Sequence, residues 1–142
     1  MYTLEEFDRV KTKVMKYIVF KKRTENEVRQ KFQNVIEENM LEDIIQYVKE
    51  AGYINDYEYI EKQVNEYKVL KTLSIKEIKY KLLSRGLSKD LIEDYIQANY
   101  DELQEYENQC LEKMINKKSG TMEEEKLKQY LFKKGYRGEF NE

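Results

Sequence analysis

Histidine is absent from this 142-residue sequence, and Cys110 is its only cysteine. A single cysteine cannot form an internal disulfide, and without histidine the sequence lacks the common zinc motifs, His-based general bases and Ser or Cys triads. The acidic run at residues 123–125 does not replace them, because solvent and the helix dipole would keep neighbouring carboxylates on a first helical turn ionised. We therefore expect no catalytic residues, no cofactor and no metal site.

Long hydrophobic runs are also missing, the run at residues 17–20 being typical in length. No segment predicts a transmembrane helix or the hydrophobic region of a secretory signal, so we expect a cytoplasmic protein with no membrane contact. The sequence also has no large excess of either charge, since it contains 26 basic and 28 acidic residues. This balance argues against nucleic-acid binding by bulk electrostatics alone. The mean hydropathy of -0.91 would suit a disordered chain, but the apolar residues are periodic, which favours a folded one.

What the sequence does contain is an internal repeat with an offset of about fifty residues. The stretch "MLEDIIQ" at 40–46 returns as "LIEDYIQ" at 91–97. Apolar residues with the 3-4-3 spacing of one helical face return as well. They are Phe7, Val10, Val14 and Tyr17, then Tyr57, Ile60, Val64 and Tyr67, with a looser copy at Tyr106 and Cys110. Such a period predicts stacked structural units that bury apolar faces against one another.

Helix starts and ends recur within the repeat. Thr24 and Ser74 each precede a glutamate by three residues, Glu27 and Glu77, which is the pattern of a capping box. The same pattern occurs at Thr3 with Glu6 and at Thr121 with Glu124. Helix ends are predicted at Gly52, Gly86 and Gly135, where the next residue (Tyr53, Leu87 or Tyr136) would pack back on Val48, Leu82 or Leu131.

These signals predict an all-α fold of tandem three-helix repeats in an elongated, curved array. Helices are expected near residues 4–22, 24–35, 39–51, 56–71, 74–85, 89–99, 102–118 and 122–134. Repeat 1 would cover residues 1–52, repeat 2 residues 53–99 and repeat 3 residues 100–142, the last with two helices and a short C-terminal stub. Asp56 is expected to cap or open the second long helix, since no second metal ligand stands near it at a suitable spacing.

Four motifs in sequence resemble the RecX family, regulators of the bacterial recombinase RecA. They are "RTENEVRQKF" at 23–32, "GYINDYEYIE" at 52–61, "SIKEIKYKLLSRGL" at 74–87 and "KLKQYLFKKGY" at 126–136. The resemblance covers nearly the whole chain. It implies a modulator that binds in the groove of the RecA filament, spans neighbouring protomers, and suppresses ATP hydrolysis, strand exchange and coprotease activity. We expect the protein itself to be a monomer. Two features depart from the family pattern, namely the short last repeat and the acidic stretches "IEEN" and "LED".

Basic residues at the ends of the long helices and on the short helices have two interpretations. The simpler one is that they stabilise the negative ends of helix dipoles. The functional one is a basic strip along one side of the array that meets RecA or the DNA inside its filament. The strip would contain Lys21, Lys22, Arg23, Arg29, Lys31, Lys71, Lys76, Lys79, Arg85, Lys117, Lys118, Lys126 and Lys128, with Lys133 and Lys134 extending it.

Alternative functions stay open at this stage. A helical module could bind single- or double-stranded DNA directly, with its tyrosines stacking on bases, or the array could be a scaffold for an unrelated protein. For Tyr17, Tyr57, Tyr67, Tyr95 and Tyr106 the predicted inner-face positions favour core packing. Cys110 stands where the earlier copies have valine, so we interpret it as a small hydrophobic residue rather than a redox group.

Overall fold

The structure is a computed structural model that describes residues 2–136, and every regular element within that range is a helix. The all-α prediction is confirmed, and each expected helix is present with its ends close to the predicted positions. The predicted C-terminal stub lies almost entirely in residues 137–142, outside the described residues. The helices are α1 (Leu4–Phe20), α2 (Glu25–Phe32), α3 (Glu38–Glu50), α4 (Asp56–Leu70), α5 (Ile75–Ser84), α6 (Lys89–Ala98), α7 (Tyr100–Lys118) and α8 (Glu124–Lys134).

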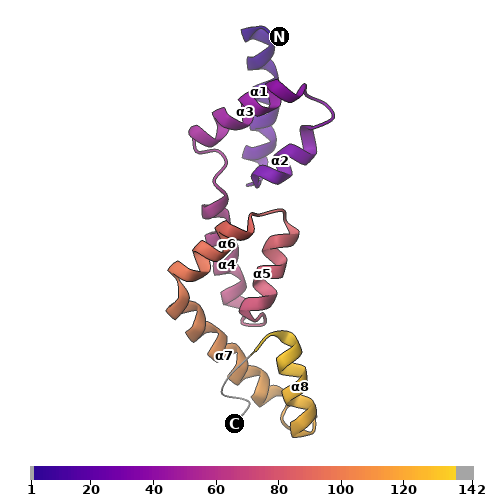
Figure 1. The fold of residues 1–142 in the computed structure, drawn as a ribbon, viewed down its shortest axis with the longest axis vertical. Coiled ribbons are helices and arrows are strands. Elements are labelled where there is room, and N and C mark those ends of the chain that lie inside the picture. The colour runs from indigo at the N-terminus through magenta and orange to yellow at the C-terminus, as the bar shows by residue number, and fades with distance from the viewer. Residues whose placement is uncertain (1, 137–142) are drawn as a thin grey trace.

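The helices follow one another along a long, narrow molecule (Figure 1). Helices α1, α2 and α3 contact one another, and so do α4, α5 and α6. Helix α7 contacts α6 at one end and α8 toward the other (Figure 1). We propose that the three predicted repeats, 1–52, 53–99 and 100–142, are the units of this array.

Two separate hydrophobic cores stabilise the array. The first joins α1 to α3 and includes Val14, Val28, Ile44 and Val48. The second runs continuously from α4 to α8 and includes Ile60, Val64, Leu82, Tyr106, Cys110 and Leu131. Val14, Val64 and Cys110 are all fully buried, which confirms that Cys110 packs as a small hydrophobic residue. Burial also raises the pKa of its thiol, so the reactive thiolate is disfavoured.

The predicted capping boxes are formed at two of the four sites. Thr24 and Ser74 accept the N–H of Glu27 and Glu77, whose carboxylates accept the cap residue's own N–H. Thr3 forms the hydroxyl half of its box by accepting the N–H of Glu6 at 3.1 Å.

The prediction for Thr121 is wrong. Its hydroxyl donates to the carbonyl of Lys118 at 3.0 Å, which holds Thr121 in the turn that follows α7. Helix α8 consequently begins only at Glu124, with Glu123 in the N-cap position.

The three predicted glycine endings are confirmed, with φ values of +82° at Gly52, +81° at Gly86 and +109° at Gly135. At Gly52 and Gly135 the following residue donates its N–H to the carbonyl five residues earlier, as in a Schellman motif. Leu87 and Tyr136 are buried as expected, whereas Tyr53 is 43% exposed, so its predicted packing on Val48 stays a prediction. Ile54 fills the core there instead, at 4% exposure.

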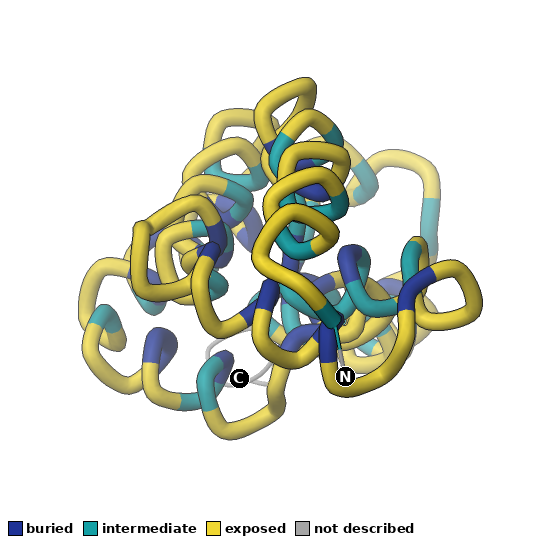
Figure 2. Tube along the Cα trace, turned by 90° about the horizontal axis from the view of Figure 1, so that it is seen from above, coloured by how far each residue is buried: buried dark blue, intermediate teal, exposed yellow. Residues whose placement is uncertain are grey.

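Tyrosine burial follows the prediction with one exception. Tyr95 and Tyr106 are buried, and Tyr17 and Tyr67 are half-buried. Tyr57 is exposed at the rim, where its ring edge contacts Tyr95 with centroids 5.7 Å apart. The reason is its place in the first turn of α4, beside the junction between the first two units. Figure 2 shows the general pattern, with buried positions on the inner sides of the helices and exposed ones outside.

None of the helices in the described part of the chain is long and apolar enough to cross a membrane.

Candidate interaction surface

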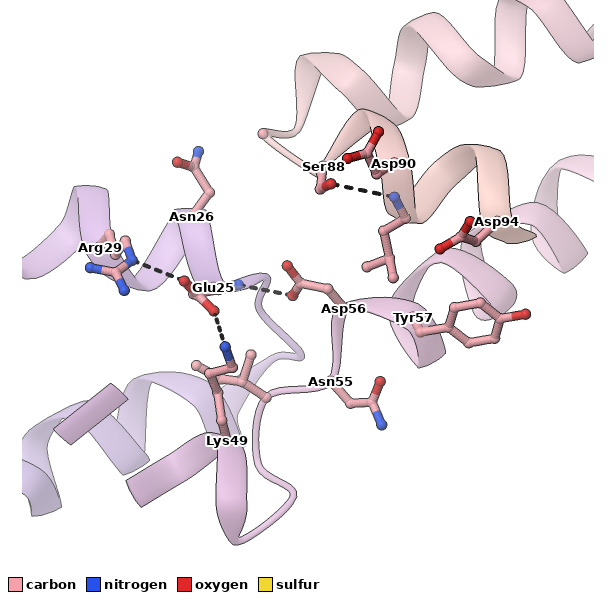
Figure 3. Close-up of a pocket in the computed structure, with 13 residues that line it drawn as sticks. Glu25, Asn26, Arg29, Lys49, Asn55, Asp56, Tyr57, Ser88, Asp90 and Asp94 are labelled. Carbon is pink, nitrogen blue, oxygen red and sulfur yellow. Dashed lines mark hydrogen bonds and ion pairs between the residues drawn. The ribbon is translucent and has the colours of Figure 1, made fainter. Parts of the chain in front are cut away.

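Asp56 links the first unit to the second. It is the first residue of α4, as expected, but Asn55 caps that helix by accepting the N–H of Glu58 at 3.0 Å. The carboxylate of Asp56 instead accepts the N–H of Glu25, the first residue of α2, at 3.0 Å (Figure 3). The first N–H groups of a helix have no partner within it. A side chain from the next unit therefore satisfies one of the free N–H groups of α2.

The side chain of Glu25 extends this link into a charge network. Its carboxylate lies 3.0 Å from the Nε of Arg29 and 2.9 Å from the Nζ of Lys49 (Figure 3). Arg29 also holds Glu42 of α3 with both terminal guanidinium nitrogens, one of them at 3.1 Å. Forked guanidinium–carboxylate pairs of this kind fix orientation as well as distance. The network holds α2 and α3 in place at the junction.

The pKa values of the junction carboxyls are shifted in opposite directions. Burial raises the pKa of Asp56, and the nearby charges of Glu25 and Glu27 add to that effect against the opposing N–H of Glu25 and the charge of Lys49. Burial would also raise the pKa of Glu25. The hydrogen bonds and charges of Lys49 and Arg29 outweigh burial there and lower that pKa. The junction thus keeps Glu25 ionised and makes ionisation of Asp56 less favourable.

An open pocket of about 650 Å³ lies at this junction, between α2 and the start of α6. Four carboxylates and two cations line it, so its charge is acidic. The lining residues are Glu25, Asn26, Arg29, Lys49, Ile54, Asn55, Asp56, Tyr57, Gly86, Ser88, Asp90, Leu91 and Asp94.

A second pocket of about 500 Å³ occupies the equivalent place at the next junction. Ile75, Lys76 and Lys79 line it where Glu25, Asn26 and Arg29 line the first, each fifty positions earlier. Gly135 takes the place of Gly86. The same repeated geometry therefore offers an acidic pocket at one junction and two lysines at the next.

The two glycines show how closely consecutive units approach. A Cβ on Gly86 would lie 2.8 Å from the Cβ of Asn26, and a Cβ on Gly135 would lie 2.7 Å from the Cβ of Lys76. In each case the end of a short helix abuts the start of the short helix in the preceding unit. Only glycine tolerates both this contact and the positive φ.

Many of the cations predicted for the basic strip have partners inside the molecule. Ion pairs join Lys22 to Glu58 at 2.8 Å, Lys79 to Glu93 at 3.1 Å and Lys128 to Glu124 at 3.8 Å. Other strip cations contact tyrosines. The guanidinium of Arg23 lies 4.0 Å from the ring centroid of Tyr17, with Lys31 at 5.7 Å from the same ring; Arg85 donates to Tyr59, and Lys118 lies 5.8 Å from the ring of Tyr130.

The remaining strip cations are exposed and form no ion pair with any residue in the range 2–136. They are Lys21, Lys71, Lys76, Lys117 and Lys126. Of the two extending residues, Lys133 is exposed, whereas Lys134 pairs with Glu77 at 2.8 Å and donates to the carbonyl of Thr72. The ammonium groups of these unpaired lysines can donate hydrogen bonds to a partner. They are therefore the residues of the predicted strip that are best placed to bind one.

The sequence patterns missed the residues that define the junction pockets. Asn26, Asp90 and Asp94 stand on helix surfaces and follow no core spacing. The offset of fifty carried a partial signal, because Asn26 and Lys76 occupy equivalent positions just after the capping residues. In the part of the chain that the structure describes, no three Cys, Asp or Glu side chains gather closely enough to hold a metal ion.

Replacing Asp56 by alanine is expected to lower the free energy of unfolding by about 1–2 kcal/mol at neutral pH, because the N–H of Glu25 loses its acceptor. Asp56→Asn keeps an amide oxygen that can accept this N–H, so its cost should be smaller. Urea unfolding of both variants measures the difference. Equal losses in the two variants would contradict the cross-unit cap.

Comparing the native protein with Asp56→Asn at different pH values tests the pKa of Asp56. Its folded-state pKa is raised, so the folded protein binds this proton more tightly than the unfolded chain does. The resulting stabilisation is complete below the unfolded-state pKa and is lost as the pH rises through the folded-state pKa. We therefore expect the stability of the native sequence relative to Asp56→Asn to increase as the pH falls from about 7 to about 4.

The repeated units and their equivalent junctions define the class of this molecule, an elongated α-helical repeat protein. A crystal structure of RecX from Lactobacillus salivarius has the same fold, with a TM-score of 0.77 and 26% sequence identity over 97% of this chain and 93% of that one. The regulatory protein RecX of Staphylococcus carnosus (strain TM300) is 32% identical over 127 residues, which cover 86% of this chain. The chain belongs to the RecX family.

The similarity extends to other bacteria. The regulatory protein RecX of Caldanaerobacter subterraneus subsp. tengcongensis is 35% identical over 101 residues, 70% of this chain. The chain spans about half the length of these curated relatives, with 47% of the Staphylococcus carnosus protein and 49% of the Caldanaerobacter protein covered. No family model matches the chain.

Proposed function

We propose that this protein regulates a bacterial RecA recombinase by binding its filament and suppressing ATP hydrolysis, strand exchange and coprotease activity, and so acts in recombination, DNA repair and the SOS response. The observation that carries the proposal is the shared fold with RecX over 97% of the chain, together with its curated relatives named as regulatory proteins. Suppression would be steric and electrostatic, with the protein acting as a monomer in the cytoplasm.

The shape of the molecule supports this function. The units follow one another along a long axis, so equivalent surfaces recur along the array (Figure 1). A filament of identical protomers offers equivalent surfaces in the same way. The unpaired lysines, Lys21, Lys71, Lys76, Lys117 and Lys126, are the part of the basic strip that we propose faces the filament.

Direct action on DNA is the alternative, and the charge of the molecule disfavours it. The net charge is -2, and several strip cations are neutralised by carboxylates within the molecule. Affinity for DNA grows with the number of phosphates that a protein neutralises, so internally paired cations contribute little to it. DNA binding remains one outcome of the test below.

We expect RecA-dependent ATP hydrolysis on single-stranded DNA to fall when this protein is added below the RecA concentration. A parallel titration of the protein against the same DNA without RecA should show weak, strongly salt-dependent binding. Inhibition that begins only once the DNA is saturated by this protein would instead mean competition for DNA, and would support the alternative.

A charge-reversed variant, Lys71→Glu with Lys76→Glu, is the second arm of this test. Both lysines are exposed and unpaired within residues 2–136, so the helical circular dichroism signal should be preserved. The concentration needed for half-inhibition should rise about tenfold, in line with the loss of two favourable charges at an interface. A matched control, Glu5→Lys with Glu6→Lys at the exposed start of α1, also changes two charges and should leave inhibition unaffected. Unchanged inhibition by the lysine variant would remove the basic strip from the proposed mechanism.

A further inference from the structure

Helices α1 and α4 each end in a pair of exposed apolar side chains. Val19 and Phe20 in the last turn of α1 are 70% and 87% exposed. Val69 and Leu70 in the last turn of α4 are 80% and 61% exposed. Core packing explains none of these four residues, because the inward face of each helix is already supplied by Val14 and Ile18 or by Ile60 and Val64.

The two pairs stand at the same place in consecutive units. Val69 and Leu70 follow Val19 and Phe20 by fifty positions, which is the offset of the repeat. Each pair is followed directly by a lysine, Lys21 or Lys71, that is exposed and forms no ion pair within residues 2–136. Two units thus present the same sequence of two apolar side chains and one free cation.

The third unit does not complete the series. Ile115 of α7 stands where Val69 stands in α4, and it packs partly against the second core. The next position is Asn116, a polar residue. The apolar pair is therefore a feature of the first two units. The lysine is present in all three, since Lys117 stands where Lys71 stands in the second unit.

Single exposed apolar residues are common on soluble proteins and need no explanation. A pair that recurs at an equivalent place in consecutive units is different, because exposed apolar residues without a function are not expected to recur at the offset of the repeat. Around the first pair the surface is also hollowed, where Thr12, Met15, Lys16, Val19 and Phe20 line an open groove of about 430 Å³. The adjoining lysine favours a partner surface that combines an apolar patch with carboxylates.

We propose that residues 19–21 and 69–71 are two equivalent contact elements, each of which docks on one of two neighbouring RecA protomers in the filament. This inference rests on the proposed function and names the contact that carries it. Because α1 and α4 follow each other along the array, their ends meet a partner that offers the same site twice (Figure 1). Linking two contacts in one chain turns the second into an intramolecular event, so affinity for the filament exceeds affinity for an isolated protomer.

The test compares Phe20→Gln, Leu70→Gln and the double variant. Glutamine keeps helix propensity, and both residues are exposed, so melting temperatures should stay within about 2 °C of the native value. The matched control is Leu4→Gln with Val35→Gln, which removes two apolar residues that are 83% and 79% exposed and lie outside the elements. Binding is measured by anisotropy of the labelled protein, against RecA filaments on single-stranded DNA and against a RecA variant unable to polymerise. The same proteins are also titrated against the bare single-stranded DNA.

Each single variant should lower affinity for the filament about tenfold, because one of two linked contacts is lost. Affinity for the isolated protomer should fall only about twofold, the statistical loss of one of two equivalent elements. The double variant should lose affinity for both partners, and the control should match the native protein in both assays.

Three results would overturn the proposal. The first is a double variant that binds the filament as well as the control does. The second is a single variant whose loss of affinity is as large for the protomer as for the filament, since the elements would then not be equivalent. The third is a parallel loss of affinity for bare single-stranded DNA, which would make DNA the occupant. If the native protein itself failed to bind the filament, that result would contradict the proposed function. It can be told apart from the other three, because they concern only the variants.

Discussion

Replacing Gly86 by alanine should lower the free energy of unfolding by about 3 kcal/mol or more, from backbone strain and overpacking together. Gly86 has a φ of +81°, where a side chain is strained. A Cβ there would also lie 2.1 Å from the Nδ2 and 2.8 Å from the Cβ of Asn26. The amide group can rotate away, but the Cβ of Asn26 is fixed to the backbone of α2, so the two units must move apart.

Gly52 provides the matched control for this substitution. It has nearly the same φ, +82°, but a Cβ added to it meets no atom within 4 Å. Gly52→Ala therefore measures backbone strain alone, about 1–2 kcal/mol. The additional loss in Gly86→Ala is the cost of the contact between the units.

A double-mutant cycle with Asn26→Gly tests the same contact from the other side. Removing the side chain of Asn26 leaves room for the alanine, so the double variant should be more stable than the sum of the single losses predicts. Urea unfolding followed by circular dichroism gives all four free energies. If Gly86→Ala costs no more than Gly52→Ala, the two short helices do not approach as closely as the structure places them.

Truncating Ile44 or Ile60 should destabilise different parts of the molecule. Both isoleucines are fully buried, Ile44 in the first core and Ile60 in the second. Loss of buried methyl groups together with the cavity left behind costs about 2–5 kcal/mol. Because the two cores are separate, Ile44→Ala should reduce the stability of α1 to α3 much more than that of α4 to α8, and Ile60→Ala should do the reverse.

Native-state hydrogen exchange measures both effects, since it reports the opening free energy of each helix separately. Amides of the first three helices should lose protection by about the full cost of the cavity in Ile44→Ala, with a change below about 1 kcal/mol in the other five. Equal loss of protection throughout the molecule in both variants would mean that the junctions couple the cores into one cooperative unit.

The helices could be predicted because their signals are local. A hydroxyl three residues before a glutamate marked the starts at Thr24 and Ser74, and glycine marked the ends at Gly52 and Gly86. The failure at Thr121 has the same local origin, since its hydroxyl could bond either forward to the next helix or back to the carbonyl of Lys118. Short polar side chains commonly have both choices, and sequence alone does not rank them.

Lys71 shows another limit of local signals. Helix α4 ends there in the left-handed conformation, with a φ of 52°, although lysine carries a Cβ and glycine is the usual residue at such an end. The exposed apolar pair that precedes Lys71 was present in the sequence as a repeat at fifty positions. The sequence did not show that both side chains of this pair are exposed. Their exposure follows from how α4 packs on α5 and α6.

The amino-acid sequence by itself determined the all-α class, the repeat and most of the helix boundaries, because capping, glycine conformation and apolar spacing act within a few residues along the chain. Only the tertiary structure decided that Asp56 caps a helix of the preceding unit, and which strip cations are paired and which remain free. Some of these pairs lie within one unit, such as Lys79 with Glu93 and Lys128 with Glu124, but the links between units, Asp56 with Glu25 and Lys22 with Glu58, join residues 31 and 36 positions apart. Their distances follow from how the units stack, and no local pattern encodes that stacking.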